Sequence, residues 1–352
     1  MVDVDVNVRK ALEVIFFTPK VDNLDPLFGH SIDWIQSFCP RVDKLSVYAV
    51  HVSKSTSLDD KNLSVFEIGG GSLVIRIKAI LLLLKVSLRI AFSGGKNKLV
   101  IYHMAKEPAL VLGPLLKIFK VRQVLWYSHS ASSKSLRFVH YFINEVYTPT
   151  VVSYPICDKK VKVSGHGIDS SKFCITNPQV RNIHNIVSLG RISRIKHLER
   201  IIQVFPTDSI TLEFIGRIMD EEYKLELETI ARARKINIHI KGEVAYKDIP
   251  SIFRRASICY TGSPKTLDKA AVQAAMCGCF VISEETEALE SLGMAGFWNR
   301  LGFMSIPALE QQLKEILKLD SVTMERERKA ISSFTREKHD LNRLIELILD
   351  SK

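Results

Sequence analysis

Three predicted strands in the second half of the chain each end in a turn that contains glycine, and a helix of small residues follows them. Apolar strands that alternate with helices are typical of a parallel sheet covered on both faces. The carboxyl ends of such strands lie at one edge of the sheet, where glycine turns and helix N-termini can bind phosphate groups. The segments are Ile186–Lys196, Leu212–Gly216, Ile238–Val244 and Thr266–Gly278.

Length and cysteine content set broad limits on the protein. With 352 residues and 46% hydrophobic side chains, the chain is long enough for two domains with their own cores. The six cysteines show no CxxC pair and no histidine partners at zinc spacing, so we expect neither a metal site nor a disulfide framework. Residues 1–7 carry acidic side chains where a secretory signal is basic. These features are typical of a cytoplasmic protein.

The first half also alternates predicted strands and helices. Apolar strands are expected at Glu13–Thr18, Leu45–Val50, Leu99–His103 and Gln123–His129. Residues 174–183 contain proline and polar side chains and are expected to form a linker. We therefore expect α/β architecture, with an N-terminal domain over 1–175, a C-terminal domain over 185–332, and a final helix over 333–352 in which apolar residues recur at helical spacing.

Positive charge is concentrated in the first half of the chain. Residues 1–180 contain 23 Lys and Arg against 14 Asp and Glu, whereas residues 181–352 contain 26 against 24. Between residues 72 and 137 there are 12 basic residues and a single acidic one, Glu107. This asymmetry predicts an anionic partner for the first half.

The most apolar segment, Leu73–Phe92, is expected to be a long helix that does not cross a membrane, because four basic residues interrupt it. At 3.6 residues per turn, Lys78, Lys85 and Arg89 fall in one stripe, and apolar residues fill much of the remainder. A basic amphipathic helix can lie on an anionic membrane surface. The alternative is an ordinary buried helix with one wet edge. Nucleic acid is not an expected partner, since no nucleic-acid-binding motif accompanies the basic residues.

Several short motifs along the chain match those of one enzyme family, and they occur in the same order. Arg191 and Lys196 match the arginine and lysine of a G-R-x-x-x-x-K signature, and further matches are Trp126–His129, Gly165–Asp169 and Asp268–Gly278. With these motifs the chain resembles the retaining glycosyltransferases of family 4, also called group 1, and among them a subset with Ser/Thr-Leu-Asp-Lys in place of a double-glutamate motif. The resemblance implies the GT-B fold, in which two Rossmann-like domains face a cleft and the C-terminal helix crosses back to the first domain.

The resemblance also implies a nucleotide-sugar site. Negative charge builds on the leaving diphosphate during sugar transfer, and cations and N–H groups must stabilise it. Arg191 ends a predicted strand and Lys196 stands near the start of a helix, so both are expected at the diphosphate, although two solvated charges are the alternative. With His129 and Asp268 they form the predicted catalytic set. The predicted donor-binding residues are Gly29, Gly190, Gly216, Gly242, Glu243, Val244, Thr266, Leu267, Lys269 and Gln273.

The sequence departs from the family at its two usual glutamates. Alignment on Cys277 and Gly278 places Gln273 at the second glutamate and Lys265 at the first. A glutamine can still hydrogen-bond ribose hydroxyls, and Asp268 is expected to take over the contact to the transferred sugar. Four interpretations of this departure stay open. The protein uses an unusual donor, its carboxylate stands at another position, the glutamate was changed by engineering, or the activity is lost. Thr266 is expected as a capping residue ahead of a helix that begins at Leu267.

Four further residues come from the turns of the two domains. His129 ends a strand and is expected against the donor sugar, with a capping histidine as the alternative. Gly29 matches a glycine where the backbone approaches donor or acceptor. His103 is a weaker candidate that could belong to the core. His166, in the Gly-His-Gly turn, is interpreted as structural.

The resemblance implies a retaining glycosyltransferase that needs no metal or cofactor and no protein nucleophile. Its expected partners are a nucleotide sugar, a glycan or lipid-linked acceptor and an anionic membrane surface, at the cytoplasmic face of the membrane. The second hypothesis is a catalytically degenerate GT-B protein that binds nucleotide or glycan without turnover. A dinucleotide-dependent oxidoreductase is not expected, because Gly69–Gly71 does not form a GxGxxG pattern.

Overall fold

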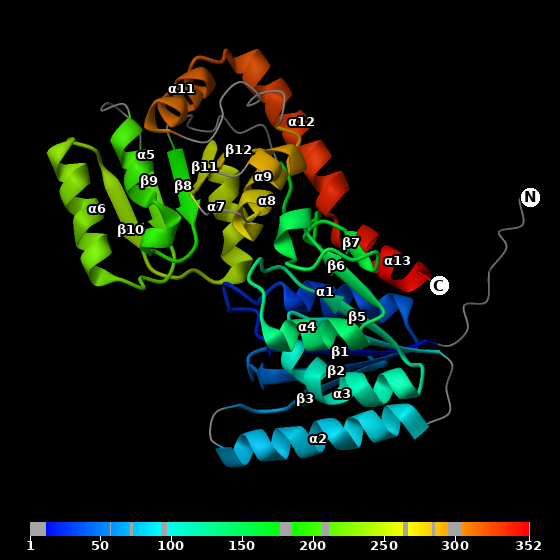
Figure 1. Cartoon of the computed structure of the whole chain (residues 1–352). Helices are drawn as coiled ribbons and strands as arrows, with labels where there is room; N and C mark the ends of the chain where they lie inside the picture. Colours follow the sequence, from blue (N-terminus) through cyan, green and yellow to red (C-terminus); the bar gives the residue numbers. More distant parts are fainter. Residues whose placement is uncertain are drawn as a thin grey trace, which may run out of the picture. The chain divides into compact units, whose positions relative to one another are not determined.

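The chain forms two compact units (Figure 1). The computed structural model describes residues 12–56, 58–70, 73–92, 97–176, 185–205, 211–262, 267–283, 286–294 and 305–351. The first unit spans Met1–Thr148, Tyr154–Lys162 and Ile348–Lys352, and the second spans Pro149–Ser153 and Val163–Leu347. Each unit contains its own sheet, which confirms the α/β architecture predicted from the sequence.

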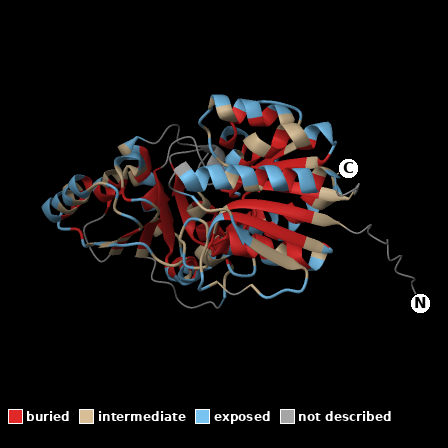
Figure 2. Cartoon of the chain, turned by 90° about the horizontal axis from the view of Figure 1, so that it is seen from below, coloured by how far each residue is buried: buried red, intermediate tan, exposed pale blue. Residues whose placement is uncertain are grey.

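The first unit is built on a seven-stranded sheet. Its strands are β1 (Glu13–Val21), β2 (Lys44–Val52), β3 (Leu63–Glu67), β4 (Lys98–His103), β5 (Arg122–Trp126), β6 (Glu145–Thr148) and β7 (Val161–Val163). The strand order is β3-β2-β1-β4-β5-β6-β7, and the pairs from β3 through to β6 are parallel. The central strands are apolar and buried along most of their length, as Figure 2 shows in red, because helices cover both faces.

Helices cover the two faces of this sheet. They are α1 (Ser31–Phe38), the short 3-10 helix η1 (Cys39–Arg41), α2 (Leu73–Phe92), α3 (Lys106–Ile118) and α4 (Lys134–Phe142). Side chains alternate along β1: Ile15 and Phe17 join the core with α2, α3 and α4, whereas Phe16 packs against Trp34 and Phe38 around α1. The long helix predicted over residues 73–92 is therefore confirmed.

The second unit is built on a five-stranded sheet. Its strands are β8 (Asn185–Leu189), β9 (Thr211–Ile215), β10 (Ile238–Lys241), β11 (Ile258–Thr261) and β12 (Phe280–Ser283). They are parallel, in the order β10-β9-β8-β11-β12. The helical elements are η2 (Val151–Ser153), η3 (Arg194–Lys196), α5 (Leu198–Val204), α6 (Glu221–Ala233), η4 (Tyr246–Asp248), α7 (Ile249–Arg255), α8 (Lys269–Met276), α9 (Thr286–Ser291), α11 (Ile306–Leu317) and α12 (Ser321–His339). A last helix, α13 (Leu341–Asp350), begins in the second unit, and its final residues belong to the first.

The end of the chain forms two helices, where one was predicted over residues 333–352. Asp340 has an extended backbone and separates α12 from α13. Its neighbours bond to the second unit's glycine-rich turn: the Ile168 N–H donates to the His339 carbonyl at 2.9 Å, and the Leu341 N–H donates to the Ile168 carbonyl at 3.0 Å. The helix is interrupted because these backbone groups pair with another segment. The predicted domain limits stay predictions.

Candidate active site

Glycines shape the carboxyl edge of the second unit's sheet. Gly190 follows β8 with φ of +147°, and Gly216 follows β9 with φ of +150°. A Cβ atom on Gly216 would lie 1.9 Å from the Gly190 carbonyl oxygen, so no other residue fits there without moving the backbone. The Gly190 N–H donates to the Ile215 carbonyl at 2.9 Å, which ties the two turns together. The edge therefore offers backbone without side chains at two neighbouring strand ends.

Lys196 lies beside this edge, in the turn formed by η3. His197 takes the left-handed conformation, with φ of 45°, and its carbonyl accepts a hydrogen bond from the Tyr260 hydroxyl at 2.9 Å. Gly262, after β11, allows the turn to approach, because a Cβ atom there would lie 2.3 Å from the Lys196 carbonyl oxygen. The turn that carries Lys196 is thereby packed onto the end of β11.

The Asp268 carboxylate holds the Lys196 ammonium group. Oδ2 of Asp268 accepts hydrogen bonds from Lys196 Nζ at 2.7 Å and from Thr261 Oγ1 at 2.6 Å. The side chains of Lys196 and Asp268 are only 13% and 21% exposed, so their charges are partly shielded from water. The arrangement positions one cation at the edge where β8, β9 and β11 end.

Asp268 also marks the start of α8, and this corrects one expectation. The helix begins at Lys269 rather than at Leu267. Asp268 occupies the N-cap position but makes no side-chain capping bond, because its carboxylate is engaged with Lys196 and Thr261. Lys269 Nζ lies 5.8 Å from the centre of the Tyr246 ring, a cation–π contact.

Gln273 is a buried amide on α8. Only 1% of the residue is exposed, yet neither Oε1 nor Nε2 has a hydrogen-bond partner among the described residues. Leaving a buried polar group unpaired costs about 1–3 kcal/mol. The amide therefore has unused hydrogen-bonding capacity inside the second unit.

His166 holds the backbone just before Asp268. Burial lowers its pKa to about 4, so the ring is neutral near pH 7, and Nε2 lies 2.8 Å from the Leu267 carbonyl oxygen. A carbonyl only accepts, so Nε2 carries the proton. The His166 N–H donates to His339 Nδ1 at 3.1 Å, and His339 Nε2 lies 3.0 Å from the Ser291 carbonyl oxygen. The structural role predicted for His166 agrees with these contacts.

The remaining predicted donor-binding residues of this unit have less defined surroundings. Gly242 and Glu243 are exposed after β10, and a Cβ atom on Gly242 would meet nothing within 4 Å. Val244 is half-buried and packs against the core. Arg191 is exposed and forms no ion pair within the described part of the chain. Thr266 and Lys265 lie outside the described residues.

In the first unit, His129 and Gly29 lie in loops at the carboxyl edge, and His103 ends β4. His129 is exposed after β5, and its Nδ1 accepts a hydrogen bond from the Ala131 N–H at 3.0 Å. Gly29 is buried, and its N–H donates to the Asp25 carbonyl at 2.9 Å. His103 is fully buried among aromatic rings, with Nδ1 at 3.2 Å from Thr18 Oγ1, so it belongs to the core. The roles of His129 and Gly29 at the donor stay predictions.

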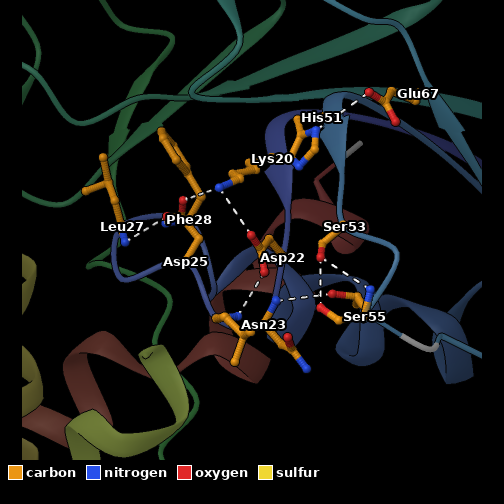
Figure 3. A network of polar contacts seen from close by, with 12 residues as sticks. Lys20, Asp22, Asn23, Asp25, Leu27, Phe28, His51, Ser53, Ser55 and Glu67 are labelled. Atoms are coloured by element: carbon orange, nitrogen blue, oxygen red, sulfur yellow. Dashed lines mark hydrogen bonds and ion pairs between the residues drawn. The ribbon is translucent and has the colours of Figure 1, made fainter. Parts of the chain in front are cut away.

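A polar network at the same edge was not anticipated from the sequence (Figure 3). Lys20 Nζ lies 3.1 Å from Asp22 and 2.7 Å from Asp25. The Asp25 carboxylate also accepts hydrogen bonds from the N–H groups of Leu27 and Phe28. Burial opposes ionisation of Asp25, but the hydrogen bonds from Lys20 and these backbone groups lower its pKa. The charged residues that follow the first strand in the sequence could have indicated this network.

The last residues of β2 and β3 and the loop after β2 carry further polar contacts. The Asn23 N–H donates to Thr56 Oγ1 at 3.2 Å, the hydroxyls of Ser53 and Ser55 lie 2.8 Å apart, and His51 Nδ1 lies 3.6 Å from Glu67 Oε1 (Figure 3). The carboxyl ends of β1, β2 and β3 therefore share one polar surface. Hydroxyl, carboxylate and amide groups of this kind can hydrogen-bond a sugar.

Comparison with known proteins identifies the class of protein. Residues 180–330 match the family described as glycosyl transferases group 1. The two parallel-sheet units have the GT-B fold, which confirms the fold predicted from the sequence, and the matched residues carry the pattern of a glycosyltransferase family. No curated protein matches the chain.

Solved structures resemble the chain over nearly its whole length. A glycosyltransferase from Rickettsia africae ESF-5 has a TM-score of 0.71 and 14% identity, covering 98% of this chain and 100% of its own. Anabaena HepE in complex with UDP-glucose has a TM-score of 0.69 and 15% identity, covering 96% and 98%. A UDP-forming trehalose-phosphate synthase from Burkholderia xenovorans has a TM-score of 0.66 and 10% identity, covering 97% and 98%. These identities establish the fold alone.

Proposed function

We propose that the protein is a retaining glycosyltransferase of the family 4 type. It would move a sugar from a nucleotide-sugar donor to a glycan or lipid-linked acceptor at the cytoplasmic face of a membrane. The observation that carries the proposal is the partly buried Lys196, which donates to Asp268 beside the turns of Gly190 and Gly216, while Thr261 holds the same carboxylate. A fixed cation beside exposed backbone suits a diphosphate. HepE was solved with UDP-glucose, which supports a UDP-sugar as the first donor to test.

In the proposed reaction the bond between the sugar's anomeric carbon and the diphosphate oxygen breaks, and its electron pair stays on that oxygen. The acceptor hydroxyl forms the new bond on the same face of the sugar, and its proton passes to the leaving diphosphate. Lys196 and the exposed Arg191 would stabilise the diphosphate charge, which is worth about 100-fold or more in rate for one well-placed donor. Asp268 would contact the sugar, and Gln273 would hold the ribose hydroxyls.

A panel of UDP-, GDP-, ADP- and dTDP-sugars tests the proposal. We expect one donor to raise the unfolding temperature and to release its nucleotide slowly, and proton NMR of the product to show an unchanged anomeric configuration. Failure of all donors to bind would contradict the nucleotide-sugar site. An inverted product would contradict the retaining mechanism.

A second candidate function is a degenerate GT-B protein that binds a nucleotide or glycan without turnover. Gln273 favours it, because a neutral amide stands where the resemblance implies a carboxylate. Binding of a donor without nucleotide release, even with lipid-linked acceptors present, would support this function. Release of nucleotide by Gln273→Glu but not by the wild type would assign the loss to this position.

A further inference from the structure

The α2 helix of the first unit has a broad face that its own unit does not bury. Leu83, Val86 and Ile90 are 6–7% exposed and join the core of the sheet. Eight large apolar side chains on α2 are exposed by 39–70%: Val74, Ile75, Ile77, Ile80, Leu81, Leu84, Leu88 and Phe92. In Figure 2, α2 lies nearest the viewer and is mostly pale blue. So much exposed apolar surface on one helix indicates an interaction surface.

The exposed side chains of α2 are ordered around the helix axis. At about 100° per residue, five of the exposed apolar positions from Ile77 to Leu88 fall within an arc of roughly 120° beside the buried face. Three exposed basic residues form a stripe along the far border of that arc. We call these eight residues the α2 surface: Ile77, Lys78, Ile80, Leu81, Leu84, Lys85, Leu88 and Arg89. The buried-helix alternative fails because the apolar arc is exposed.

Exposed apolar and basic side chains continue from α2 onto the neighbouring end of α3. The rings of Phe92 and Phe119 lie 4.9 Å apart, and Ile118 is 74% exposed. Lys117 and Lys120 are exposed beside them. An apolar area bordered by cations therefore continues from the last turn of α2 to the end of α3.

The charges on this area distinguish between two possible partners, a second copy of the chain and an anionic lipid surface. The three cations of the α2 surface form no ion pair within the described part of the chain, and Glu107 is the only acid between residues 72 and 137. In a symmetric dimer formed through this face, the same basic patch would meet itself and repel. An anionic lipid surface instead complements the cations and accepts the apolar side chains.

We propose that the α2 surface docks the protein on a bilayer that contains anionic lipid. The helix would lie in the plane of the interface, with the apolar arc among the acyl chains and Lys78, Lys85 and Arg89 at the headgroup phosphates. None of the helices in the described part of the chain is long and apolar enough to span a membrane. Membrane docking is argued from α2 itself. It rests on the proposed function only where it places the protein beside an acceptor at the membrane.

Vesicle flotation of the full chain tests the proposal. We expect binding to phosphatidylcholine vesicles with roughly one third phosphatidylglycerol, weaker binding as salt screens the charges, and little binding to phosphatidylcholine alone. The triple variant K78E/K85E/R89E should bind anionic vesicles at least about 100-fold more weakly, because each basic residue near the surface contributes roughly a fivefold factor. Because the three side chains are exposed, the fold should be unaffected.

Two further variants separate charge from apolar insertion. Leu81→Asn with Leu88→Asn leaves every charge unchanged and should still reduce vesicle binding about tenfold or more, because two exposed apolar groups no longer enter the bilayer. The matched control is K314E/R326E/K329E, which reverses three exposed cations of the second unit and should bind within about threefold of the wild type.

Three outcomes would overturn the proposal. The first is a wild type that does not bind anionic vesicles. The second is an equal loss of binding in K78E/K85E/R89E and the matched control. The third is a wild type that does not bind vesicles but forms a dimer, which the Leu81/Leu88 variant converts to a monomer. Nucleotide release from the donor is measured on every variant without lipid. It reports the proposed function separately, and the α2 variants should leave it unchanged.

Discussion

At the scale of single residues, Gln273 gives the most direct prediction. Its buried amide has no partner among the described residues, so Gln273→Leu should leave the free energy of unfolding unchanged or raise it. The same change should weaken nucleotide binding about 3–10-fold, through the loss of hydrogen bonds to the ligand. Urea titration and calorimetry measure the two effects. A variant that loses stability but binds nucleotide normally would contradict the assignment.

Asp268 predicts a separation between binding and turnover. Asp268→Asn removes the carboxylate that competes with a phosphate for Lys196, so UDP binding should stay within about threefold of the wild type or become tighter. Nucleotide release from the donor should fall about 10–100-fold, because the variant loses both the sugar contact and the fixed lysine. Calorimetry and a nucleotide-release assay compare the two. Equal losses in both would show that Asp268 serves only to hold the site together.

At the scale of elements, the turns after β8 and β9 are held together by a glycine contact. Gly216→Ala would place a Cβ atom 1.9 Å from the Gly190 carbonyl and force an unfavourable φ, so it should cost the second unit about 3 kcal/mol or more. Gly242→Ala is the matched control, because its Cβ would meet nothing within 4 Å, and it should change stability by less than about 0.5 kcal/mol. Thermal unfolding compares them. Similar losses in both variants would contradict the described packing.

The glycine-rich turn, α8 and α12 are linked through two buried histidines, and this predicts a pH dependence. Burial lowers the pKa of His166 to about 4 and that of His339 to about 3, below the value of about 6.5 for an unfolded chain. Between pH 6.5 and 4 the unfolded state binds protons that the folded state does not. Stability is therefore greatest above pH 6.5 and falls as the pH falls through this window.

A histidine replacement measures this contribution. His166 should account for a loss of about 2 kcal/mol between pH 7 and pH 5. His166→Gln keeps a donor for the Leu267 carbonyl and removes the titrating ring, so its stability should fall less over the same range. The exposed His239→Gln is the control and should follow the wild type. Identical pH profiles for wild type and His166→Gln would rule out this role.

At the scale of the whole molecule, local sequence patterns predicted the elements better than the contacts between them. The helix over residues 73–92 and the strands that end before Gly190 and Gly216 followed from apolar runs and glycine. The ion pair of Lys196 and Asp268 joins positions 72 apart, which no local pattern specifies. Periodicity placed the cations of α2 in one stripe, but only tertiary packing decides which face of the helix is buried.

We expect Lys196 to bind the diphosphate of a nucleotide sugar. Calorimetry with UDP, GDP and ADP, on the wild type, Lys196→Ala and the exposed control Lys314→Ala, tests it most directly. We predict that one nucleotide binds, that Lys314→Ala binds like the wild type, and that Lys196→Ala binds about 10–100-fold more weakly, as expected for a charged hydrogen bond. A wild type that binds none of the three, or a Lys196→Ala variant that binds as tightly as the wild type, would contradict the claim.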